Sequence, residues 1–117
     1  MKKILVIDDD VDVIDLVDYI LIANGFKVIE SQKMLAIEEI IQLNPNLIIV
    51  DYLVKSNYGE RLCLQLKANE LTKHIPIILF STHSELASVA ERTCPDAYIE
   101  KPFDLRVFEE TVESLAL

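Results

Sequence analysis

Five polar side chains of this chain stand where short apolar runs end. They are Asp8, Asp9, Asp51, Ser81 and Lys101. If the runs before them are parallel strands, the carboxyl ends of those strands lie along one edge of a sheet, which is where open α/β sheets bind ligands. The spacing therefore predicts a single cleft that holds three carboxylates, a hydroxyl group and an ammonium group.

The chemistry of such a cleft begins with its negative charge. Two carboxylates about 4 Å apart repel by roughly 4 kcal/mol at an effective dielectric constant of about 20, so a cation must offset them. Mg²⁺ suits the site because it prefers oxygen ligands and typically uses carboxylates, waters and a phosphate. Lys101 supplies a second, fixed positive charge. A carboxylate beside Mg²⁺, a lysine and a hydroxyl donor can attack a phosphoryl group and form an acyl phosphate, which indicates self-phosphorylation.

A simpler explanation exists for part of this pattern. Acidic residues at the start of a helix complement its dipole, and this explanation suffices for Asp10 and Asp12. It does not explain Asp51, which closes an apolar run near the middle of the chain and needs a compensating partner. Ser81 and Lys101 are weak signals when taken singly, since serine is common after strands and lysine is usually solvated. Their occurrence at successive strand ends favours the shared site.

Short β-rich runs alternate with helical patterns five times, with no linker or repeat between them. The runs at 4–7, 47–50 and 77–80 are apolar without alternation, as expected for central strands covered on both faces. The runs at 26–30 and 97–99 are more mixed, which suits the two edges. The right-handed crossover rule then predicts an α/β fold with a doubly wound five-stranded parallel sheet, order 2-1-3-4-5, of the flavodoxin-like (βα)₅ type.

Five amphipathic helices should cover this sheet. The first begins at an N-cap of Asp10 or Asp12 and ends at Gly25, and Asn44-Pro45-Asn46 stops the second. The others are expected at about 58–69, 84–93 and 105–115. On the first helix, the predicted buried stripe consists of Val13, Leu16, Val17, Ile20 and Leu21, and the apolar residues outside it are Ile14, Tyr19 and Ile22. The latter three are candidates for contact with a partner protein, and the alternative that they are ordinary scattered surface residues stays open.

Length and composition limit the function classes. At 117 residues and 51% hydrophobic, the chain fits one domain, 1–117. A net charge of -9 argues against direct binding of nucleic acid or an anionic membrane. No apolar stretch approaches the roughly 20 residues of a membrane span and no cleavable signal is visible, so a cytoplasmic location is expected. The two cysteines are too few for a disulfide framework, and Cys63 is expected in the core.

The motifs together resemble the receiver domain of two-component response regulators, of the single-domain chemotaxis type or the phosphorelay type. The resemblance covers the whole chain. It rests on the opening Ile4–Asp9, the strand Leu47–Asp51, Gly59 eight residues past Asp51, Ser81 after the fourth run, and the segment Tyr98–Phe103.

The resemblance implies a role for each residue of the cleft. Asp51 would accept phosphate from a phosphohistidine of a histidine kinase or phosphotransfer protein. Slow dephosphorylation is expected because Leu53, two residues past the acceptor, would crowd out the hydrolytic water. Mg²⁺ would be bound directly by Asp9, Asp51 and the backbone carbonyl of Leu53, with Asp8 acting mainly through water. Lys101 would pair with the phosphoryl group. Ser81 and Tyr98 would switch the surface formed by the fourth helix, fifth strand and fifth helix.

Several positions depart from the pattern of that family. Lys55 stands where a proline usually follows the acceptor, and Lys33 replaces a turn glycine. Cys94-Pro95 replaces the usual Gly-Ala. These changes affect loops and leave the chemical residues in place. The Lys101-Pro102 bond is expected to be cis, as in the family.

Two other functions remain open at this level. One is a phosphatase of the haloacid-dehalogenase type, because Asp8-Asp9-Asp10 offers an Asp-x-Asp pair, although 117 residues leave little room for such an enzyme. The other is an interaction module that works without phosphate, although such a module would be expected to lose its acceptor or lysine. The chain is expected to carry no output domain, so its signal would pass to an unknown output protein. The sequence does not decide between a single-domain regulator and a part of a longer protein, and homodimer formation stays open.

Overall fold

The computed structural model describes residues 2–51, 58–81, 95–101 and 103–116. Its strands are β1 (Lys3–Ile7), β2 (Lys27–Ser31), β3 (Leu47–Asp51), β4 (Ile77–Ser81) and β5 (Ala97–Glu100). Its helices are α1 (Val11–Ala23), α2 (Ile37–Leu43), α3 (Tyr58–Ala68) and α5 (Leu105–Leu115). The helix expected at 84–93 falls outside the described residues.

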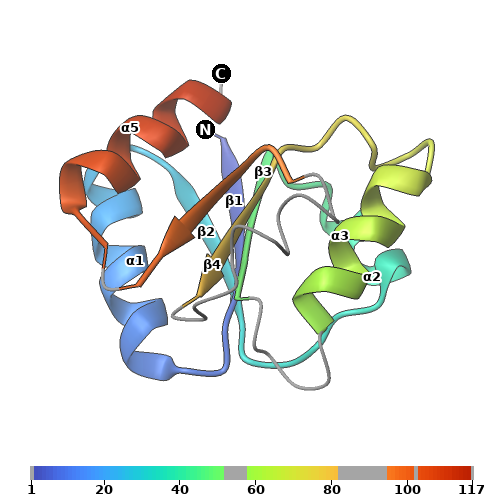
Figure 1. The fold of residues 1–117 in the computed structure, drawn as a ribbon, viewed down its shortest axis with the longest axis horizontal. Helices are drawn as coiled ribbons and strands as arrows, with labels where there is room; N and C mark the ends of the chain where they lie inside the picture. Colours follow the sequence, from blue (N-terminus) through green and yellow to red (C-terminus); the bar gives the residue numbers. More distant parts are fainter. Residues whose placement is uncertain (1, 52–57, 82–94, 102, 117) are drawn as a thin grey trace.

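All five strands run parallel in the order β2-β1-β3-β4-β5, which confirms the predicted fold. Figure 1 shows α1 and α5 on one face of this sheet and α2 and α3 on the other. The register aligns Ile7 with Val50, and Asp51 with Phe80. The carboxyl ends of β1, β3 and β4 therefore meet at one edge of the sheet.

The two faces of the sheet bury separate apolar clusters. Leu5 and Ile7 of β1 pack toward α2 and α3, while Ile4 and Val6 pack toward α1 and α5. All four side chains are at most 1% exposed. Because both faces are covered, the central strands have no polar alternation, as the sequence indicated. Cys63 is also buried, as expected.

The ends of the helices follow local sequence chemistry. Asp10 caps α1, because its Oδ1 accepts a hydrogen bond of 2.9 Å from the amide of Asp12. After α1, Gly25 takes a φ of +88°, a backbone conformation that glycine adopts without a Cβ clash. Asn44 ends α2 with a left-handed φ of 49°. The predicted start of α1 at Asp10 and the two predicted helix ends are thus confirmed.

One prediction about α1 was wrong. Ile14, expected outside the buried stripe, is 1% exposed, whereas Leu16, expected within it, is 51% exposed. The buried stripe of α1 is Ile14, Val17, Ile20 and Leu21, so the prediction is confirmed for the last three. Since α1 is apolar on much of its circumference, periodicity could not choose between two neighbouring orientations. Among the described helices, none is long and apolar enough to cross a membrane.

Candidate functional site

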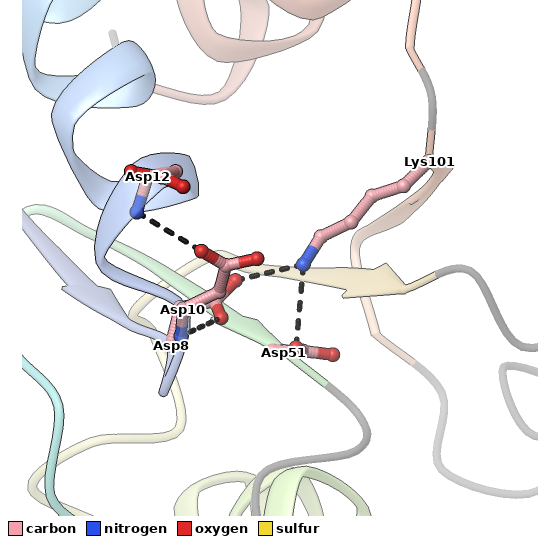
Figure 2. A network of polar contacts seen from close by, with 5 residues as sticks. All are labelled: Asp8, Asp10, Asp12, Asp51 and Lys101. Carbon is pink, nitrogen blue, oxygen red and sulfur yellow. Dashed lines mark hydrogen bonds and ion pairs between the residues drawn. The ribbon is translucent and has the colours of Figure 1, made fainter.

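The sheet topology brings the candidate residues together. Asp51 is the last residue of β3, and Asp8 follows β1, the neighbouring strand. Lys101 follows β5, which lies beyond β4, and its side chain extends back across the sheet edge. Figure 2 shows its ammonium between Asp8 and Asp51. Three segments that are distant in sequence thus form one polar cluster.

The Lys101 ammonium makes two ion pairs. Its Nζ lies 2.9 Å from Asp8 Oδ2 and 3.3 Å from Asp51 Oδ2. The three side chains are 12%, 2% and 9% exposed, in the order Lys101, Asp8 and Asp51. Burial by itself lowers the pKa of Lys101, but the two carboxylates outweigh it and hold that pKa above its ordinary value. The lysine is therefore a fixed cation at the sheet edge.

Asp8 is held by three elements. Its amide donates to the carbonyl of Ser31 at the end of β2, at 3.1 Å. Its Oδ1 accepts from the amide of Asp10 at 2.9 Å, just before α1, and its Oδ2 accepts from Lys101 after β5. Both carboxylate oxygens are thereby oriented. Asp10 itself caps α1, so the helix-capping explanation holds for this acid (Figure 2).

The carboxylates at the sheet edge could bind a metal ion, because Lys101 balances only part of their negative charge. Single carboxylate oxygens of Asp8, Asp9 and Asp51 lie within 4.8 Å of one another. Asp9 is exposed, whereas the other two are buried. The three carboxylates exceed the one ammonium by two negative charges, which a divalent cation would balance. Because all three donors are hard oxygens, the set suits Mg²⁺ better than a metal that prefers nitrogen or sulfur.

The remaining predicted residues have different outcomes. Ser81 ends β4 and is in register with Glu100, so its backbone lies at the same sheet edge. Leu53, the expected carbonyl ligand, lies outside the described residues, as does Pro102 with its expected cis bond. Tyr98 lies on β5 with 51% of its side chain exposed and is not part of the cluster around Lys101.

A groove runs beside the site between α1 and the start of α5. It has a volume of about 430 Å³ and is lined by Val13, Leu16, Tyr19, Ile20, Lys101, Phe103 and Leu105. Apart from Lys101, these side chains are apolar or aromatic. The lysine thus borders both the groove and the acidic cluster. The sequence alone gave no indication of this groove, because its residues come from two separate segments.

A family model described as the response regulator receiver domain matches residues 4–113. The chain belongs to this family. As a receiver, it is a signalling domain and not a metabolic enzyme, and it has the acidic pocket at which receiver domains bind Mg²⁺. Response regulators of this kind interact with histidine kinases and output domains.

Curated relatives of this receiver are longer proteins. The phosphate regulon transcriptional regulatory protein PhoB of Pseudomonas aeruginosa is 31% identical over 108 residues, covering 90% of this chain and 47% of PhoB. The DNA-binding dual master transcriptional regulator RpaA of Synechocystis is 29% identical over 118 residues, covering 98% of this chain and 49% of RpaA. The receiver thus spans about half the length of these relatives.

Solved structures agree with this fold. The N-terminal domain of the nisin resistance regulator NsrR is 26% identical, with a TM-score of 0.82 and coverage of 100% of this receiver and 99% of that chain. The chemotaxis protein CheY4 of Vibrio cholerae has a TM-score of 0.85 at 19% identity, with 98% of both chains covered. The second similarity concerns the fold alone.

Proposed function

We propose that this receiver takes a phosphoryl group from the phosphohistidine of a histidine kinase or phosphotransfer protein onto Asp51, in a Mg²⁺-dependent reaction. The observation that carries the proposal is the buried Lys101 ammonium shared between Asp8 and Asp51, with a third carboxylate within ligand distance. This arrangement combines a nucleophilic carboxylate with two means of neutralising phosphoryl charge.

Each residue has a definite task in the proposed reaction. An Asp51 carboxylate oxygen forms a bond to phosphorus as the phosphorus–nitrogen bond of phosphohistidine breaks. The electron pair of that bond stays on the imidazole nitrogen, and a proton on the other ring nitrogen of the phosphohistidine lets the donor leave as a neutral histidine. Lys101 pairs with the negative charge on the phosphoryl oxygens, and the Ser81 hydroxyl donates a hydrogen bond to one of them.

Four groups of the chain would hold the metal. They are Asp8, Asp9, Asp51 and the backbone carbonyl of Leu53, with Asp8 acting mainly through water. When bound, Mg²⁺ neutralises charge on the phosphoryl oxygens and orients them for in-line attack. The exposed position of Asp9 supports this assignment, because an ion can reach that carboxylate from solvent.

The output would be a change of surface around β5. Tyr98 is half exposed on this edge strand, and Ser81 is in register with Glu100 of the same strand. A Ser81 bond to the phosphoryl group would therefore act on a strand that carries an exposed aromatic side chain. We assign the switching surface to β5, α5 and the segment at 84–93, and the response is a shift between two populations.

The phosphodonor would dock beside the groove at α1. Leu16, Tyr19 and Ile22 are 51%, 77% and 61% exposed on α1, and Leu16 and Tyr19 line the groove that Lys101 borders. Such a set of exposed apolar side chains suits contact with a helical donor domain. Ile14 is excluded from this surface because it is buried.

Labelling with acetyl phosphate tests the proposal without a kinase. A stable acyl phosphate that forms with Mg²⁺ and fails to form with EDTA supports the receiver reaction. Rapid turnover of acetyl phosphate without a stable adduct would favour the phosphatase alternative. A complete lack of labelling would favour an interaction module that works without phosphate.

A further inference from the structure

Phe80 lies directly beside the lysine of the site. It is the residue before Ser81 on β4 and is 1% exposed. Its ring faces Lys101, with 4.9 Å between Nζ and the ring centroid. Phe80 is also in register with Asp51 on the neighbouring parallel strand, so both side chains project from the same face of the sheet. The ring and the acceptor carboxylate therefore flank the same ammonium.

The Phe80 ring is fixed by two other aromatic rings. Phe103, two residues past Lys101, meets it edge to face, with centroids 5.0 Å apart and an interplanar angle of 70°. Phe108 of α5 lies 6.1 Å from Phe80 and 5.1 Å from Phe103, centroid to centroid. Such edge-to-face and tilted arrangements are the favourable ones for aromatic pairs. The face that Phe80 turns to Lys101 is thus held by packing from β4, α5 and the segment between β5 and α5.

We infer that Phe80 is a positioning residue, whose ring holds the Lys101 ammonium at the site by a cation–π interaction. A lysine ammonium within about 6 Å of a ring centroid is attracted by the negative face of the ring, and more strongly where water is excluded. Lys101 is only 12% exposed. Unlike the ion pair with Asp51, this attraction does not change when Asp51 reacts.

The role of the Phe80 ring in phosphoryl transfer rests on the proposed function. Asp51 loses its carboxylate charge when it becomes an acyl phosphate, so one of the two ion pairs of Lys101 is replaced during the reaction. Asp8 and the Phe80 ring would keep the ammonium in place through that exchange. The contact of the ring with Lys101 therefore contributes to the rate of phosphoryl transfer, apart from what the buried ring contributes to the folded state.

A matched pair of variants tests this role. Phe80→Leu removes the ring that faces Lys101, whereas Phe108→Leu removes another buried ring of the same cluster. We expect Phe80→Leu to label with acetyl phosphate about fivefold more slowly, which corresponds to about 1 kcal/mol. Phe80→Tyr keeps the ring face and should restore most of the rate. Phe108→Leu should melt at a lower temperature but label faster than Phe80→Leu, because it leaves the ring that faces Lys101 in place.

Fluorinated phenylalanines at position 80 keep the shape of the ring and weaken its negative face. The labelling rate should fall stepwise with each added fluorine. These variants also test the positioning role of Phe80 in the case that Phe80→Leu does not fold. A rate that is independent of fluorination, or an equal loss in Phe80→Leu and Phe108→Leu, would overturn the positioning role.

A second readout does not depend on phosphorylation. The ε-methylene protons of Lys101 should show an upfield ring-current shift in the NMR spectrum of the unlabelled parent. The shift should vanish in Phe80→Leu and persist in Phe108→Leu. An unchanged shift in Phe80→Leu would refute the contact. A parent that shows the shift but never labels would instead refute the proposed function and leave the contact standing.

Discussion

Lys101 Nζ and Asp8 Oδ2 lie 2.9 Å apart, although 93 positions separate the two residues in the chain. The contact spans much of the sheet edge, because β3 and β4 lie between β1 and the edge strand β5. The same ammonium also pairs with Asp51 at 3.3 Å. A single ammonium therefore pairs with two buried carboxylates. This excess of negative charge determines how the site responds to metal and to mutation.

Neutralising Asp9 should stabilise the metal-free protein. Asp9 adds a third negative charge to a cluster with one ammonium, so Asp9→Asn should melt at a higher temperature than the parent in EDTA. Asp9→Asn should also lose most of the increase in the free energy of unfolding that Mg²⁺ gives the parent. For a ligand that binds only the native state, that increase is about 2.7 kcal/mol when its concentration is a hundredfold above Kd. Glu113→Gln, which neutralises an exposed acid of α5, is the control and should do neither. A parent indifferent to millimolar Mg²⁺ would contradict the metal site.

Removing the cation should destabilise the fold. Lys101→Met leaves Asp8 and Asp51 buried without their ammonium, and breaking a buried pair in this way typically costs about 3 kcal/mol or more. Urea unfolding in EDTA should show this loss. Mg²⁺ should restore part of the stability, because the ion supplies positive charge to the same carboxylates. An equal loss with and without Mg²⁺ would show that the metal does not share these ligands.

Asp18 of α1 should make stability depend on pH. Burial, the hydrogen bond with Glu30 of β2 and the charges of Glu30 and Asp15 raise the pKa of Asp18 from 3.8 to about 7. Because the folded protein holds this proton more tightly than the unfolded chain, the contribution is fully present below 3.8 and is lost as pH rises through about 7. Asp18→Asn should therefore gain melting temperature over the parent as pH increases across this interval. Parallel pH profiles for the two proteins would contradict the assignment.

The exposed face of α1 should matter for transfer from a kinase and not for small phosphodonors. Tyr19 is 77% exposed beside the groove, so Tyr19→Ala should leave the fold unchanged. It should slow phosphoryl transfer from a histidine kinase that labels the parent by about fivefold or more, the effect of losing roughly 1 kcal/mol of contact. Its rate with acetyl phosphate should equal that of the parent. Leu71→Ala, at another exposed apolar residue, is the control, and an equal effect of both variants would reject α1 as the docking surface.

The sequence predicted the sheet and its polar edge because both depend on local features. Asp51 and Lys101 could be placed together as soon as the parallel strands were recognised, since the ends of such strands share one edge. The exposed side of α1 was not predictable, because Ile14 and Leu16 are equally apolar and only packing against the sheet separates them. In the sequence, Phe80 is only the end of the apolar run 77–80. Its contact with Lys101 depends on side-chain directions that a sequence does not contain.

The pair of Asp18 and Glu30 shows the same limit. Each acid alone is ordinary for a surface position, and their proximity follows from the orientation of α1 over β2. Local pattern thus defines the elements and the residues at their ends. Contacts between elements need the packed structure.

The central claim is that Asp51 is the sole phosphoacceptor, and intact-mass measurement tests it most directly. After incubation with acetyl phosphate and Mg²⁺, the parent should gain the mass of one phosphoryl group, and the adduct should be absent with EDTA. Asp51→Asn keeps the size of the side chain and removes the nucleophilic carboxylate, so it should gain no mass. Asp10→Asn, at the neighbouring helix cap, should still be labelled. Labelling of Asp51→Asn to the same extent as the parent would contradict the assignment of the acceptor.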